Sequence, residues 1–205
     1  MKSILIDTST SNVTISIVDD NKVLYCYDEE IKNDMSSQIL PIIDTALSKT
    51  NLKLKDLDKI FVVNGPGSFT GIRIGVTIAK VISWALKIDV VPLSSLELMA
   101  TTSTETKYIV PMIDARRGNV FAGIYDGDLN VIKEDSLVNL NDFVCALDDN
   151  YTLVSYDNIL SSKRPKIDTL KIISKHSSDT EINPHKLSAN YLKLTEAEEK
   201  RLKND

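Results

Sequence analysis

An internal repeat constrains the fold of this chain more than any other feature. Residues 6–19 align without a gap with residues 113–126, at an offset of 107 positions, and six of the fourteen aligned residues are identical. In both copies an apolar run that ends in Asp is followed by a second apolar run, which is typical of a β-hairpin. The repeat therefore predicts two related domains, and 205 residues are enough for two small ones.

The first copy opens a recognisable order of elements. Three antiparallel strands, followed by helix, strand, helix and strand, form the ribonuclease-H-like unit, and two such units make the α/β architecture of actin, Hsp70 and sugar kinases (ASKHA). We expect the two domains to cover residues 1–103 and 104–205. The predicted strands span residues 3–8, 13–18, 22–28, 60–63 and 90–93, and the predicted helices span 36–49, 71–87 and a short segment capped by Ser94 or Ser95.

The second copy is degenerate. Beyond Asp128 the sequence is polar and weakly periodic, and it offers strand candidates only at residues 151–156 and 170–173. The charged tail over residues 195–205 is either a short terminal helix or a solvated segment.

Composition excludes several classes of protein. The net charge of -5 disfavours a stand-alone nucleic-acid binder, which normally carries a basic surplus. Two distant cysteines, Cys26 and Cys145, are too few for a disulfide framework and suit a reducing cytosol. The N-terminal apolar run is too short for a signal peptide, and no apolar stretch is long enough for a membrane span. We therefore expect a cytoplasmic protein without membrane contact.

A glycine-rich segment, GPGSFTG, begins at Gly65 and is the best candidate for a phosphate-binding loop. It lacks the Lys and Ser/Thr of a Walker A loop, and Thr70 stands where a dinucleotide fingerprint needs its third glycine. Two interpretations stay open. The favoured one is a strand-to-helix turn in which glycines adopt unusual φ angles and Ser68 or Thr70 caps the helix, and the other is a working phosphate site.

Other catalytic groups are sparse. His176 and His185 lack the spacing of metal ligands, and we expect both to be solvated. Asp7 and Asp114 occupy equivalent places in the repeat. They either form a carboxylate pair across a cleft between the domains or, as we favour, accept hydrogen bonds from their own turns. We therefore predict no catalytic, cofactor-binding or metal-binding residue.

The predicted helix over residues 71–87 is apolar over about twice the ~100° that a one-sided surface helix needs. One apolar arc is expected to cover a sheet. The second contains Gly75 and Ala79, which together with Gly71 form a stripe of small residues at i, i+4 and i+8 that would let another helix approach closely. This stripe predicts a helical interface with another protein, and internal packing is the alternative. The sheet-covering arc comprises Ile74, Ile78, Val81, Ile82 and Ala85, and the second arc comprises Ile72, Gly75, Val76, Ala79, Ser83 and Leu86.

Four segments give the chain a resemblance to a known family. They are ILIDTST from Ile4, NGPGSFTGIRIG from Asn64, SSLE from Ser94 and MIDARRG from Met112. Together with the ending ANYLK, they make the sequence similar to the TsaB (formerly YeaZ) family over essentially its whole length. The resemblance implies a non-catalytic, cytoplasmic relative of TsaD that acts in threonylcarbamoyl transfer to the adenosine of tRNAs reading ANN codons.

The resemblance also implies partners and an interface. Family members pair with TsaD, or with themselves as homodimers, through the first two helices of the first domain. TsaE, an ATPase, joins them, and tRNA is reached only through the complex. The expected partner-facing residues are Ile39, Ile43, Gly71, Ile72, Gly75, Val76, Ala79 and Ser83.

Two features depart from the family pattern. The first helix reads MSSQILP from Met35, without the His that often precedes its Leu-Leu-Pro, and the second domain is somewhat short. The alternative to a scaffold is an enzyme in its own right, either an ATP-using kinase or ATPase of this architecture or a peptidase of the kind once assigned to TsaD relatives.

Overall fold

The computed structural model describes residues 1–147, 150–179 and 182–192. The charged tail over residues 195–205, for which the sequence allows a terminal helix, lies outside these described residues.

The first half of the chain forms a five-stranded sheet with the strand order β3-β2-β1-β4-β5. The first three strands pair antiparallel as a meander, and β4 and β5 continue the sheet in parallel with β1. Short apolar runs followed by polar turns produce these strands, as the sequence predicts. Their bounds are β1 (Lys2–Asp7), β2 (Asn12–Asp19), β3 (Lys22–Glu30), β4 (Lys59–Gly65) and β5 (Asp89–Ser94).

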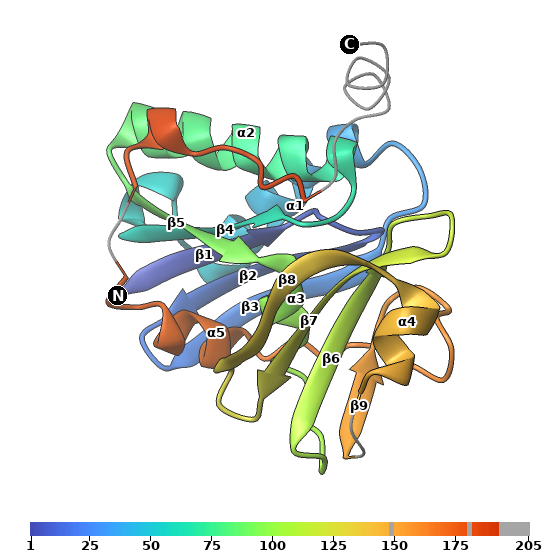
Figure 1. Ribbon diagram of the computed structural model, residues 1–205. Helices are drawn as coiled ribbons and strands as arrows, with labels where there is room; N and C mark the ends of the chain where they lie inside the picture. The colour runs from blue at the N-terminus through green and yellow to red at the C-terminus, as the bar shows by residue number, and fades with distance from the viewer. Residues whose placement is uncertain (148–149, 180–181, 193–205) are drawn as a thin grey trace.

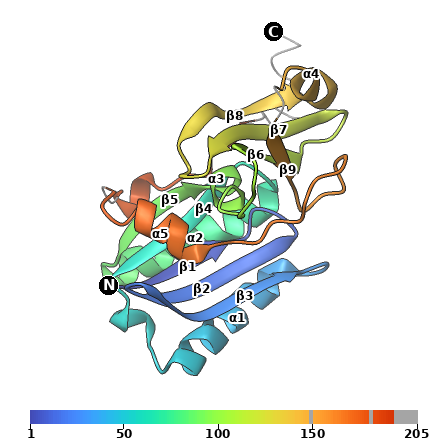
Figure 2. The same ribbon diagram turned by 90° about the horizontal axis from the view of Figure 1, so that it is seen from below.

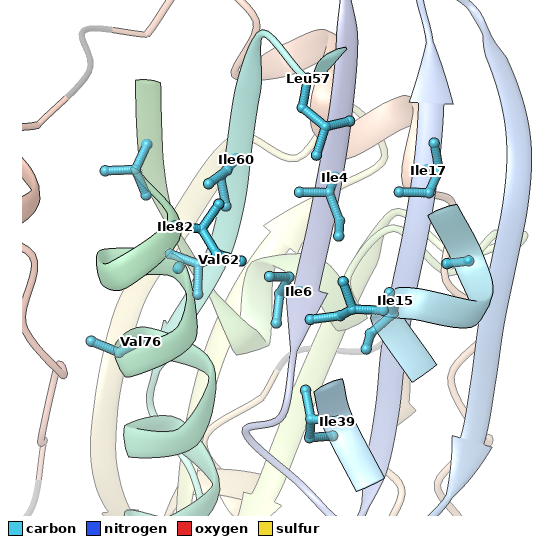
Figure 3. Close-up of a cluster of buried hydrophobic side chains, with 14 of the residues drawn as sticks. Ile4, Ile6, Ile15, Ile17, Ile39, Leu57, Ile60, Val62, Val76 and Ile82 are labelled. Atoms are coloured by element: carbon cyan, nitrogen blue, oxygen red, sulfur yellow. The ribbon is translucent and has the colours of Figure 1, made fainter. Parts of the chain in front are cut away.

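Two long helices, α1 (Met35–Thr50) and α2 (Phe69–Leu86), cover one face of this sheet (Figure 1). A 3-10 turn, η1 (Leu54–Asp56), lies between α1 and β4. The close-up in Figure 3 shows the layer of apolar side chains that the helices bury against the strands. Val76 and Ile82 of α2 lie on the same side as Ile60 and Val62 of β4 there, and Ile39 of α1 lies below Ile6 and Ile15.

The second half repeats the arrangement of the first on a smaller scale. Its sheet has the order β8-β7-β6-β9, with antiparallel β6–β7 and β7–β8 pairs and a parallel β6–β9 pair. This order matches β3-β2-β1-β4, so the structure confirms two ribonuclease-H-like units. The strands are β6 (Tyr108–Asp114), β7 (Asn119–Asp126), β8 (Val131–Asn139) and β9 (Tyr151–Val154).

The two halves share a second apolar core. The face of the first sheet that lies away from α1 and α2 packs with α3 (Ser95–Met99), α5 (Thr169–Lys175) and one face of the second sheet (Figure 2). Phe61, Leu96 and Ile172 are fully buried in this core. The far face of the second sheet packs with α4 (Leu140–Cys145).

The end of the described chain returns to the first half. Residues 182–192, here called the strap, run beside α2 and include a 3-10 turn, η2 (Pro184–Lys186) (Figure 1). Leu187 of the strap is buried in the first core. The Lys80 ammonium group binds the carbonyl oxygens of His185 and Leu187, at 3.2 and 3.3 Å. The Asn190 N–H donates to the Asn64 carbonyl oxygen at 2.7 Å. The division at residues 103 and 104 stays a prediction, and the strap crosses it.

Two predictions for the second half fail. The strand predicted at residues 170–173 is wrong, because these residues belong to helix α5. Asp168 caps this helix. Its two successive isoleucines fit one helical face as well as a strand. Strand β8 and helix α4 were not predicted, since β8 is mostly exposed and carries a polar sequence without alternation.

Candidate functional site

A cleft of about 740 Å³ lies between the two halves. On one side it is lined by the β1–β2 turn and by the start of α2, and on the other by the β6–β7 turn of the second half. The strap closes one end of the cleft, where Tyr191 stacks on Phe69 with 4.8 Å between ring centroids.

The two Asp residues of the repeat hold equivalent turns on opposite sides. The Asp7 carboxylate accepts a hydrogen bond from the Ser9 N–H, and the Asp114 carboxylate accepts one from the Arg116 N–H, each at 2.8 Å. Asp7 is buried and does not line the cleft, whereas Asp114 is exposed and does. The structure therefore favours the local-turn interpretation over a carboxylate pair.

Burial also changes the protonation of Asp7. Removal from water raises the pKa of its carboxyl to about 6, although the hydrogen bonding from Ser9 acts in the opposite direction. Asp7 therefore titrates well above an ordinary aspartate. In this environment the carboxyl supports the turn rather than facing a ligand.

The glycine-rich segment forms a strand-to-helix turn. Gly65 and Gly67 have φ angles of 128° and 149°, a region that favours glycine. Ser68 is the N-cap of α2, and its hydroxyl accepts a hydrogen bond from the Gly71 N–H at 3.2 Å. These features confirm the interpretation of a capped turn, and they direct the first turn of α2 toward the cleft.

Thr8 fills the space that the small residues of α2 leave. Its hydroxyl donates to the Gly71 carbonyl oxygen at 2.7 Å and accepts from the Gly75 N–H at 3.1 Å. A Cβ atom at Gly75 would lie only 2.6 Å from that hydroxyl oxygen. The small-residue stripe thus receives the end of β1, and no partner helix can approach it.

This contact corrects the predicted interface. All eight residues expected to face a partner are buried within the chain, because the arc that carries them covers the sheet. The wheel assigned the mostly buried arc to the outside, and its division was incomplete, because Ile82 of the other arc is also buried and Leu86 of this arc is exposed. The buried residues are Ile39, Ile43, Gly71, Ile72, Gly75, Val76, Ala79 and Ser83.

The outer face of α1 and α2 is apolar instead. A groove of about 420 Å³ runs between the two helices, and its lining includes Leu40, Phe69, Ile74 and Ile78. Sequence reasoning missed Leu40 and Phe69 as surface residues, although Leu40 is 58% exposed. The signal that could have found this face is the exposed side of α2, which carries large apolar residues: Val81, Trp84 and Leu86.

His176 is not solvated as predicted. Its Nε2 lies 3.0 Å from a Glu97 oxygen and its Nδ1 lies 2.6 Å from an Asp179 oxygen, while the Lys175 ammonium group also binds Glu97 at 2.7 Å. Hydrogen bonding to Glu97 raises the pKa of His176. Burial opposes ionisation of Glu97, yet its bonds to His176 and Lys175 hold the pKa of this carboxyl below its usual value. His185 is exposed, as expected, and its ring packs edge-on against Trp84.

Within the described ranges, no three His, Cys, Asp or Glu side chains come together as metal ligands would. Cys26 and Cys145 are free thiols. Among the described helices, α2 alone has the length and composition of a membrane span, and in this fold one of its sides is buried against the sheet.

Comparison with known proteins finds the same family in sequence and fold. A family model described as "TsaD: tRNA N6-adenosine threonylcarbamoyltransferase" matches residues 29–175. The tRNA threonylcarbamoyladenosine biosynthesis protein TsaB of Bacillus subtilis is 31% identical over 98% of this chain and 97% of its own length. The Escherichia coli protein of the same name is 30% identical over 64% of this chain and 58% of its own length.

A solved structure shares the whole fold. The crystal structure of YeaZ from Pseudomonas aeruginosa superposes with a TM-score of 0.79 at 19% identity, covering 93% of this chain and 99% of that one. Three findings point to the same family. They are the sheet order that repeats in the two halves, the capped turn before α2, and the near full-length match to the Bacillus subtilis protein. This chain therefore belongs to the TsaB family of tRNA threonylcarbamoyladenosine biosynthesis proteins.

Proposed function

We propose that this chain is a non-catalytic subunit that binds a TsaD-like catalytic subunit and activates it for threonylcarbamoyl transfer to adenosine in tRNAs reading ANN codons. The observation that carries this proposal is the apolar outer face of α1 and α2. Leu40, Val81 and Trp84 are 58%, 57% and 63% exposed there. Exposed apolar patches of this kind mark binding surfaces for other proteins.

The groove between α1 and α2 supports helix docking in particular. Its apolar lining consists of Leu40, Ile74, Ile78 and Phe69, flanked by polar residues that include Arg73, which is held over the Phe69 ring at 4.6 Å. A partner that lays helices into such a groove buries apolar residues of its own at helical spacing. A relative with the same fold can supply two such helices, which also makes a homodimer the expected state of the chain alone.

The remaining parts of the proposal concern the wider complex. A TsaE-like ATPase joins the pair, tRNA is reached through the assembled complex, and the complex works in the cytoplasm without contacting a membrane. The net charge of -5 supports an indirect route to tRNA, because direct binding needs a basic surface.

The Asp turns support a non-catalytic role. Each carboxylate is engaged by the backbone of its own turn, and the two are not brought together as an acid–base pair. The competing function is a stand-alone kinase, ATPase or peptidase. ATP hydrolysis by the purified chain with Mg²⁺, or peptide cleavage, would favour that alternative, whereas nucleotide binding without turnover would not.

The test compares two substitutions with the same chemistry. Leu40→Glu places a charge in the groove, and Leu160→Glu places one at a position of nearly equal exposure, 58% against 59%, in the second half. We expect Leu40→Glu to abolish co-purification with a TsaD-like subunit and to leave the fold intact, because burying an unpaired charge at an interface is costly. Leu160→Glu should bind normally. A Leu40→Glu protein that binds as wild type contradicts the proposal.

A further inference from the structure

We infer that a second copy of this chain docks on the outer face of α1 and α2 through two reciprocal ion pairs, each between Arg73 of one copy and Asp44 of the other. These pairs rest on the proposed function in one respect, that the outer face is an interface. They add the contacts that make this face complementary to itself and fix how the two copies are placed.

Helices α1 and α2 carry four charged side chains, and two of them are engaged within the chain. The Lys49 ammonium group lies over the Tyr25 ring at 5.4 Å, and the Lys80 ammonium group binds the strap. Arg73 and Asp44 are exposed, and neither makes a hydrogen bond or an ion pair with another described residue. The two helices therefore present one cation and one anion that a docked protein can pair.

The guanidinium group of Arg73 is held at the groove between α1 and α2. It lies over the Phe69 ring at 4.6 Å, and that ring is itself stacked on Tyr191 of the strap. Arg73 is the charged residue of the groove lining, which otherwise consists of apolar and hydroxyl side chains. A stacked guanidinium loses less freedom when a carboxylate binds its N–H groups, so this site suits a carboxylate of a docked protein.

The same chain carries a suitable carboxylate on the other helix. Asp44 lies one turn beyond Leu40 on α1, and residues four apart lie on the same face of a helix. Leu40 lines the groove from α1, and Arg73 lines it from α2. The unpaired anion and the unpaired cation therefore belong to the two helices that flank the groove, and both lie on the outer face.

Two-fold symmetry turns this arrangement into two contacts. An axis that crosses the groove between Arg73 and Asp44 exchanges their positions, so each residue comes to lie opposite the other residue of the second copy. Both ion pairs then form at once, and the exposed Leu40 is covered near the axis. A dimer of this kind leaves no charged side chain of α1 or α2 without a partner.

Charge reversal tests the pairs, with sedimentation velocity separating the 22.8 kDa monomer from the dimer. Arg73→Glu and Asp44→Lys each place like charges at both contacts. Each variant should therefore dimerise at least about a hundredfold more weakly than wild type, about tenfold for each contact. An equimolar mixture of the two variants should dimerise about as tightly as wild type, because the mixed dimer has opposite charges at both contacts.

Lys163→Glu is the matched control. It gives the chain the same net charge as Arg73→Glu, at an exposed position in the second half, and should dimerise as wild type. Circular dichroism checks that every variant melts as wild type. A monomeric wild type, a single charge variant that dimerises as wild type, or a mixture no stronger than its components overturns the inference.

Leu40→Glu separates this inference from the proposed function. A Leu40→Glu chain that still co-purifies with a TsaD-like subunit contradicts the proposed function, and a mixture that restores dimerisation still supports the ion pairs. If Leu40→Glu abolishes co-purification while both single charge variants dimerise as wild type, the ion pairs alone are wrong.

Discussion

Thr8 and Gly75 are joined by a hydrogen bond that ties the end of β1 to the backbone of α2. The Thr8 hydroxyl accepts from the Gly75 N–H at 3.1 Å and donates to the Gly71 carbonyl oxygen at 2.7 Å. These two backbone groups lie one turn apart on the helix. The end of β1 is thereby locked to the helix that faces both the cleft and the outer groove.

Removal of this hydroxyl should destabilise the fold. In Thr8→Val a methyl group takes the place of the hydroxyl, so the buried hydrogen bonds to the Gly71 carbonyl oxygen and the Gly75 N–H are both lost. We expect unfolding to cost about 2–3 kcal/mol less than in wild type. Urea denaturation measures the difference. Thr8→Ser keeps the hydroxyl and should lose less stability than Thr8→Val. An equal loss of stability in the two variants would contradict the bridging role.

Gly75→Ala should be destabilising, against the usual preference for Ala in helices. A glycine inside a helix ordinarily costs about 1 kcal/mol relative to Ala. At Gly75 the new Cβ would meet the Thr8 hydroxyl oxygen, so the gain in helix propensity is lost and the melting temperature should fall. Gly127→Ala is the control, because a Cβ there meets no atom within 4 Å. It should be neutral or slightly stabilising.

Asp7 should make stability depend on pH. The folded-state pKa of about 6 lies above the ordinary value of 3.8, so folding favours the protonated form. The stabilising contribution of Asp7 to folding is fully present below pH 3.8 and is lost as pH rises through 6. It amounts to roughly 3 kcal/mol. Asp7→Asn keeps the acceptor for Ser9 but cannot ionise.

The measurement is the free energy of unfolding of wild type and Asp7→Asn between pH 4 and 7. The advantage of the variant should grow with pH across this window. Parallel curves for the two proteins would show that the Asp7 carboxyl is not desolvated.

Glu97 should control the protonation of His176. NMR titration is direct because the chain has only two histidines. In wild type the pKa of His176 should lie above its ordinary value of 6.5. In Glu97→Gln the pKa of His176 should fall, because the hydrogen bond to the carboxylate is lost. The stability that this pairing adds is present below pH 6.5 and lost as pH rises through the folded-state pKa. An unshifted His176 in the variant contradicts the pairing.

Much of the first half could be predicted from its sequence. A short continuous apolar run predicts β1, and the alternation of apolar and hydroxyl residues predicts β2. Ser68 marks the start of α2 because serine is a preferred N-cap residue. The repeat around Asp7 and Asp114 predicted a second antiparallel hairpin, because each copy carries an apolar run on either side of a turn that begins with Asp. The register differs by one residue between the copies, since Asp7 pairs with Thr14 and Asp114 pairs with Val120.

The orientation of α2 could not be read from its sequence in the same way. A helical wheel separates two apolar arcs but contains no information on which one meets the sheet. Gly71 and Gly75 suit a close approach by any group, and the group is Thr8, 63 and 67 residues away in sequence. The ion pairs of His176 with Glu97 are equally remote in the chain, which is why His176 looked like a surface residue.

The strap has a consequence for the order in which the protein is made. Leu187 is part of the apolar layer beneath α2, and Asn190 binds the carbonyl oxygen of Asn64 near the end of β4. Domains generally fold from the N-terminus as the ribosome releases them. Here the core of the first half is closed only when the strap, which is translated after β9, has been added. A nascent chain halted after β9 therefore carries an unfinished N-terminal half.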